Sequence, residues 1–189
     1  MLLLYADCSN SQIAEIANHN IDAAVLKSTP FFAFCCISSF SAVGEGSHHP
    51  KYLQPYLNNV TGFLKSFAEK PSVCDLGCGD FNVGKRLMEF TSKYVAVDIV
   101  PEVINRNRRL FKAEHLDFQC LDIVNDDLPK TEVALIRNVL QHLSNAEVQA
   151  VVDKLSQYSY VILTEHLPEG EFSPNIDIIS GQGIRLKKN

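Results

Sequence analysis

Two cysteine pairs at metal-binding spacing are not found in this sequence of 189 residues. None of its six cysteines forms a Cys-x-x-Cys pair, and no second pair stands at zinc spacing, so the sequence predicts no metal site. Cys74 and Cys120 fall in segments patterned as buried strands, where a free thiol behaves as a small apolar side chain. This cysteine usage fits a reducing compartment, and we expect a cytoplasmic protein.

Long hydrophobic runs and an excess of basic residues are also lacking. The apolar stretch at 31–40 is too short to cross a bilayer, which takes about 20 residues. No basic region precedes the apolar run at the amino terminus, which predicts no signal peptide. Lys and Arg number 17 against 22 Asp and Glu, and the net charge of −5 argues against non-specific grip on nucleic acid. We therefore expect neither a membrane nor a nucleic-acid partner.

The chain divides into two parts. Residues 1–47 do not share the patterning of the rest and are interpreted as an N-terminal extension that is packed on the core, covers a ligand as a lid, or is poorly ordered. Residues 48–189 are predicted to form the remaining domain. A chain of this length is one domain that buries about 70% of its unfolded surface.

Segments patterned as helices and as strands alternate along the second part. Apolar residues at intervals of three and four predict a helix over 51–67. Strands are expected at 72–75, 94–98, 116–120, 133–137 and 160–165, with helices at 82–90, 101–111 and 145–155. This order predicts an α/β fold, namely a Rossmann-like, doubly wound and mainly parallel sheet with helices on both faces. Ligands of such sheets bind at the carboxyl ends of the strands.

The first of these strands leads into a glycine-rich turn, within the run PSVCDLGCGDFNVGKR. Glycines let the backbone approach a ligand closely, and the start of a following helix would offer free N–H groups. Asp75 stands two residues ahead of Gly77. A carboxylate at this point would repel the pyrophosphate of a dinucleotide and attract an ammonium group. S-adenosylmethionine carries an α-amino group and no phosphate, so the turn favours this cofactor.

A second acid stands at the end of the next predicted strand. The strand YVAVD ends at Asp98, 23 residues beyond Asp75. A carboxylate at the end of the second strand of a βαβ unit is the usual partner of ribose hydroxyls. Its two oxygens accept charge-assisted hydrogen bonds from a vicinal diol, and such bonds are the strong ones.

With these residues in place, the chain resembles the class I S-adenosylmethionine-dependent methyltransferases over 71–166, about half of its length. It departs from the family at two points. Phe81 stands where a third glycine is often found, and only 24 residues follow Glu165. That remainder is too short for the family's last helix and antiparallel hairpin. We expect the hairpin to be missing, with at most one short strand at 176–179 and a sheet edge left exposed.

The resemblance implies a set of cofactor-binding residues at the first two strand ends. Backbone groups of Gly77, Cys78 and Gly79 would follow the methionine part, with Asp75 facing its ammonium group through water. Asp98 would bind the ribose, and Ile99 would cover one adenine face. The plainer interpretation of the glycines is a tight turn without a ligand.

Two later strand ends complete the set that the resemblance implies. Asp122 would accept from the adenine amino group while Ile123 packs on the ring, unless that acid-rich loop is solvated charge. Asn138 would bind the methionine end. His142 is the candidate general base, because histidine titrates near neutrality, although a packing role is more common. Glu165 at the fifth strand end either faces substrate or starts a loop.

The function implied by the resemblance is methyl transfer to an oxygen or nitrogen atom of an unidentified acceptor. A small molecule or a glycan is favoured, given the acidic balance of charge. The alternative is a methyltransferase-like module that binds the cofactor but is catalytically incomplete. A nicotinamide-dependent oxidoreductase is disfavoured, because Asp75 would face pyrophosphate and Asn82 would occupy the place of the third glycine.

Overall fold

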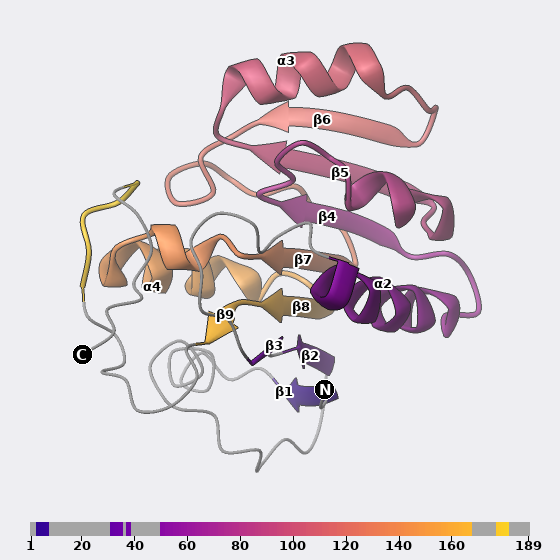
Figure 1. The fold of residues 1–189 in the computed structure, drawn as a ribbon, viewed down its shortest axis with the longest axis horizontal. Helices are drawn as coiled ribbons and strands as arrows, with labels where there is room; N and C mark the ends of the chain where they lie inside the picture. The colour runs from indigo at the N-terminus through magenta and orange to yellow at the C-terminus, as the bar shows by residue number, and fades with distance from the viewer. Residues whose placement is uncertain (1–2, 8–30, 36, 39–49, 168–176, 182–189) are drawn as a thin grey trace.

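The computed structural model describes residues 3–7, 31–35, 37–38, 50–167 and 177–181. They form a seven-stranded sheet of order β1-β2-β8-β7-β4-β5-β6 and a two-stranded pairing of β3 with β9. Figure 1 shows the large sheet with β6 at one end and β1 at the other. The predicted mainly parallel, Rossmann-like arrangement is confirmed, because every pairing from β2 to β6 is parallel.

The five predicted strands form near their expected bounds, and four of them are buried over most of their length. The strand at 116–120 buries only Phe118, and Cys120 is exposed, which contradicts its predicted burial. The five strands are β4 (Ser72–Leu76), β5 (Lys93–Asp98), β6 (Leu116–Cys120), β7 (Val133–Arg137) and β8 (Tyr160–Thr164). Apolar residues run continuously through β4, β5, β7 and β8 because a parallel sheet has both faces covered. Successive side chains therefore enter two separate cores.

One helix layer lies on each face of the sheet. Tyr94 and Ala96 pack in one core with α2 (Pro50–Lys65) and α3 (Pro101–Leu110). Val95 and Val97 pack in the other core with α4 (Asn145–Leu155). The start of α4 is fixed by a capping box, in which Ser144 and Glu147 each accept the other's backbone N–H. None of the helices that the structure describes is both long and apolar enough to cross a membrane.

The helix predicted over 82–90 is wrong. Two short 3-10 turns occupy this segment, η1 (Gly84–Arg86) and η2 (Met88–Phe90). The reason lies at Phe81, which has a left-handed backbone (φ 63°) and a fully buried ring. Gly84 passes so close that a Cβ on it would lie 2.3 Å from that ring. Phe81 and Gly84 thus fix a path that a regular helix does not follow, and the predicted helix start is absent.

Two strands from the N-terminal extension pair at the edge of the sheet that we expected to be exposed. The strand β2 (Phe31–Cys35) pairs in parallel with β8, and β1 (Leu3–Asp7) pairs antiparallel with β2. The edge of β8, which we expected to be exposed, is therefore covered. A second pairing joins β3 (Ile37–Ser38) to β9 (His166–Leu167).

Of the other predictions for the chain ends, one is wrong and the rest lie outside the described residues. Residues 177–179 form no strand, which contradicts the short strand predicted there, whereas residue 176 lies outside the described residues. The rest of the predicted extension, 8–30 and 39–47 included, also lies outside them.

Candidate functional site

A cavity of about 490 Å³ opens at the carboxyl ends of the parallel strands. It is lined by seven of the residues proposed from the sequence, which come from four different strand ends. These are Gly77, Asp98, Ile99, Asp122, Ile123, Asn138 and His142. The remaining lining residues are Leu121, Val124, Val139, Leu143, Glu147, Ser180 and Gly181. The sheet topology thus brings together predicted site residues that lie up to 65 positions apart in the sequence.

The glycine turn after β4 is built by close backbone approach. Gly77 has φ 87°, and a Cβ on it would lie 2.3 Å from Cγ2 of Val139. The N–H groups of Gly77 and Cys78 both donate to the carbonyl of Val97, at 2.9 and 2.8 Å. Only glycine meets both demands at position 77, a left-handed backbone and contact with the facing wall.

Two side chains hold Gly79 from outside the turn. Its N–H donates to Oδ2 of Asp98 at 3.0 Å, and its carbonyl accepts from Nδ2 of Asn107 at 2.7 Å. Asn107 is fully buried in α3, and sequence reasoning missed it. Its position three residues after the buried Ile104 places it on the inner face of that helix, which was the available signal.

Two of the acids that line the cavity, Asp98 and Asp122, have their carboxylates fixed by local hydrogen bonds. Oδ1 of Asp98 accepts from the Val100 N–H at 3.0 Å. Asp122 accepts from the Val124 N–H and from the Asn125 side chain, at 2.8 and 2.7 Å. Partial burial acts to raise the pKa of Asp122, but these bonds outweigh it, so its pKa lies below the usual value. The Asp122 carboxylate thus stays ionised near neutrality. Both carboxylates keep free acceptor capacity.

Residues 138–143 follow β7 and form one side of the cavity, called here the wall after β7. This wall contains a strained backbone position and a hydrogen-bond donor without a partner. Asn138 has a left-handed backbone (φ 58°), and its buried Nδ2 has no hydrogen-bond partner. Strained residues of this kind cluster at ligand sites. The turn η3 (Leu140–His142) follows, with the His142 side chain exposed at the cavity.

Three of the proposed residues do not line this cavity. Cys78 and Gly79 belong to the turn behind it, and burial raises the pKa of the Cys78 thiol. Asp75 is buried on the α2 and α3 side, where the Tyr94 hydroxyl donates to its Oδ2 at 2.9 Å. Burial raises the pKa of Asp75 to about 6, although the Tyr94 bond and the Arg137 charge act to lower it. Its predicted contact with an ammonium group stays a prediction.

Glu147 and Ser180 are further lining residues that sequence reasoning missed. Ser180 hydrogen-bonds to the Glu147 carboxylate, and the Gly181 N–H donates to the His142 carbonyl at 2.9 Å. Asp177 accepts from the Asn145 N–H at 2.7 Å. Residues 177–181 therefore lie against the start of α4 and close one side of the cavity. Because this contact joins segments remote in sequence, no local pattern predicts it.

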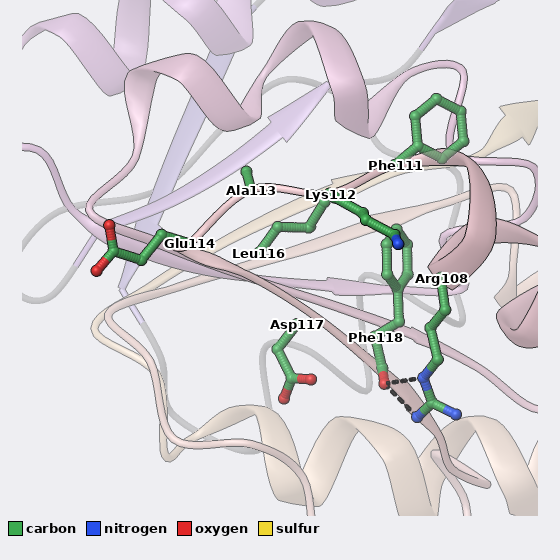
Figure 2. Close-up of a pocket in the computed structure, with 8 residues that line it drawn as sticks. All are labelled: Arg108, Phe111, Lys112, Ala113, Glu114, Leu116, Asp117 and Phe118. Atoms are coloured by element: carbon green, nitrogen blue, oxygen red, sulfur yellow. Dashed lines mark hydrogen bonds between the residues drawn. The ribbon is translucent and has the colours of Figure 1, made fainter.

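A second hollow, of about 460 Å³, lies at the outer edge of β6 and contains none of the proposed residues. In Figure 2 the Arg108 guanidinium points at the Phe118 carbonyl, to which Nε and Nη2 donate at 3.1 and 2.5 Å. Across the described residues, no three His, Cys, Asp or Glu side chains gather as metal ligands would. The cavity at the strand ends is thus the better candidate site.

Residues 74–158 match a family model described as "Methyltransferase domain". The matched segment begins in β4 and extends beyond α4, so it contains the glycine turn, Asp98 and the wall after β7. This part of the chain is similar to the methyltransferase-domain family, which confirms the resemblance seen in the sequence. No curated protein matches the chain.

Similar solved structures include the N-methyltransferase NodS from Bradyrhizobium japonicum, 18% identical over 57% of this chain and 61% of that one, with a TM-score of 0.47. Human N-acetylserotonin methyltransferase is 24% identical over 57% of this chain and 34% of that one, with a TM-score of 0.44. The 1,6-didemethyltoxoflavin-N1-methyltransferase of Burkholderia thailandensis is 19% identical over 56% and 46%, with a TM-score of 0.45. The chain therefore spans about three fifths or less of these proteins.

Proposed function

We propose that the cavity binds S-adenosylmethionine and that the chain transfers its methyl group to an oxygen or nitrogen atom of a small-molecule or glycan acceptor. The charge of the cavity wall carries this proposal. Asp98, Asp122 and Glu147 line the cavity, and among the described residues no Lys or Arg does. Such a wall attracts ammonium and sulfonium groups and repels phosphate, which argues against both dinucleotides and nucleic acid.

The residues at the cavity fit the parts of this cofactor. Each Asp98 oxygen already accepts one backbone N–H and has capacity left for a ribose hydroxyl. Asp122 would accept from the adenine amino group, with Ile99 and Ile123 on the ring. The unpartnered Nδ2 of Asn138 is a donor for the methionine carboxylate. A buried donor without a partner costs about 1–3 kcal/mol, and a ligand acceptor would remove that cost.

When bound, the cofactor supplies an electrophilic methyl group on a positively charged sulfur. The work left to the chain is mainly positioning, because the acceptor must lie in line at about 3 Å. His142 faces the cavity from η3 and is the proposed base where an acceptor must lose a proton. Metal ligands have no part in this proposal.

Calorimetry with S-adenosylhomocysteine, S-adenosylmethionine and NAD tests the binding step. We expect affinity in the micromolar range for the first two, about −8 kcal/mol, and none for NAD. Asp98→Ala should weaken binding at least about tenfold, because it removes charge-assisted bonds. The matched control is Asp117→Ala, an exposed acid in the neighbouring strand. Equal affinity of the Asp98 variant, or binding of NAD alone, would contradict the proposal.

A module that binds the cofactor without turnover is the second candidate. It is favoured by the absence of a further strand in residues 177–181, the described part of the chain after β9. Transfer of a labelled methyl group across a panel of small-molecule and glycan acceptors separates the two. Transfer that is lost in Asp98→Ala supports the enzyme, whereas binding with no transfer supports the module.

A further inference from the structure

Glu165 follows β8 directly, and its carboxylate is buried beneath the wall after β7. Oε1 accepts two backbone N–H groups, from Val139 at 2.9 Å and from Leu140 at 2.8 Å. Oε2 is buried and has no hydrogen-bond partner. Glu165 does not line the cavity, but both groups that it holds belong to the segment that does.

The contact chain from Glu165 to the cavity is short. Val139 presses against Gly77, where there is no room for a Cβ. Asn138 precedes it with a left-handed backbone, and its N–H donates to the Thr164 carbonyl at 2.8 Å. The end of β8 thus holds this wall at two points, through the Thr164 carbonyl and through the Glu165 carboxylate.

We propose that Glu165 is a positioning residue of the cofactor cavity, whose ionised carboxylate clamps Val139 and Leu140 and so holds Asn138 and Val139 in their binding position. The inference rests on the proposed function, because it takes the ligand of the cavity to be the cofactor. A carboxylate accepts N–H bonds about twice as strongly as a neutral acceptor does. The clamp therefore loosens when Glu165 takes up a proton.

The groups around Glu165 set the pH at which its carboxylate takes up that proton. Burial raises its pKa to about 7, while the Leu140 and Val139 N–H groups and the Arg137 guanidinium act to lower it. Arg137 lies at the end of β7 and acts in the same way on Asp75. A ligand that needs the clamped wall favours the ionised form of Glu165, lowers its pKa and binds more tightly as pH rises through neutrality.

Calorimetry with S-adenosylhomocysteine at about pH 6 and about pH 8 is the test. The wild-type chain should bind several-fold more tightly at the higher pH, with about tenfold per unit of pKa change as the ceiling. Glu165→Gln keeps an uncharged oxygen for both N–H groups, so it should bind measurably and show no pH step. Glu165→Ala should lose about tenfold at both values. His142→Gln is the control, since histidines titrate in this range, and it should keep the step.

A second measurement does not depend on the cofactor. Amide hydrogen exchange of Val139 and Leu140, corrected for the intrinsic pH effect, should be more protected at pH 8 than at pH 6 in the wild-type chain. The protection should be independent of pH in Glu165→Gln. A pH step in Glu165→Gln equal to that of the wild type, in binding or in exchange, would overturn the proposal. If hydrogen exchange follows the expected pattern in both chains but S-adenosylhomocysteine does not bind, the proposed function is refuted and the proposed clamp is still supported.

Discussion

Phe81 has a backbone conformation that aromatic residues rarely adopt. Its φ is 63°, yet its ring is fully buried and makes edge contacts with Tyr94, Phe111 and Phe118 at centroid distances of 4.9 to 5.6 Å. A left-handed non-glycine residue costs about 1–2 kcal/mol. The aromatic packing offsets that cost, which explains how this position works without the glycine that the family often has there.

This balance predicts an unusual order of stability at position 81. Phe81→Ala should destabilise the fold by about 3–5 kcal/mol, because it loses the ring and keeps the strain. Phe81→Gly should cost about 1 kcal/mol less, because glycine adopts positive φ freely. Urea unfolding of both variants measures the difference. Phe118, a buried strand residue, is the control, where glycine should be the worse substitution. Alanine being better at both positions would refute the strain argument.

Local patterns were sufficient for some site residues and not for others. Asp98 and Asp122 were identified because a strand's end is visible in its apolar pattern, and parallel strands end at one edge of the sheet. Asn107 and Ser180 were missed because their partners, Gly79 and Glu147, are remote in sequence and meet them only through tertiary contacts. Glu147 forms a local capping box with Ser144, but this local pattern does not reveal that Glu147 lines the cavity. Asp75 was identified as an acid ahead of the glycines, but the sequence did not reveal that Tyr94 holds it.

At the scale of elements, the two ends of the large sheet are protected differently. The edge strand β6 has its Phe118 carbonyl occupied by Arg108, which hinders the addition of another strand there (Figure 2). At the other end β8 is covered by β2, and β1 lies outermost (Figure 1). The sequence predicted the core strands from their continuous apolar runs. It could not assign residues 31–40, because an apolar run of that length fits strand and helix alike.

Removing residues 1–47 tests the role of these added strands. The shortened chain, 48–189, would expose the backbone groups of β8 along Val161, Ile162 and Leu163. We expect concentration-dependent association, seen as a rising mass in light scattering coupled to size exclusion, where the full chain gives a constant mass. If 48–189 is the cofactor-binding domain, it should keep micromolar binding of S-adenosylhomocysteine. A shortened chain that stays monomeric would show that β2 is not needed to protect β8.

At the scale of the whole molecule, the buried carboxyl groups join the site to stability. Asp75 and Glu165 each have a raised pKa, near 6 and near 7, with burial as the main cause. Burying an ionised carboxylate costs free energy, and an apolar residue would avoid that cost. Asp75 lies directly behind the glycine turn, and Glu165 lies directly behind the wall after β7. Retention of charge at these two places fits a fold that gives up stability to shape a site.

The pH dependence of stability follows from these shifts. The folded state binds protons more tightly than the unfolded state at both groups, so between about pH 4 and about pH 7 the unfolded chain holds fewer protons. The free energy of unfolding should therefore fall as pH rises through this range, by an amount on the order of a few kcal/mol. The lowered pKa of Asp122 acts in the opposite direction, but solvent screens that exposed loop and makes its effect small.

Urea denaturation across this range, with single variants, assigns the slope to its sources. Asp75→Asn should remove the part that falls between about pH 4 and pH 6, and Glu165→Gln the part that extends to about pH 7. Asp117→Asn, at an exposed acid, should leave the slope unchanged. Stability that instead rises with pH would mean that hydrogen bonds outweigh burial at these carboxyl groups. Glu165 would then be fully ionised at neutral pH, and the clamp on Val139 and Leu140 would not respond to pH.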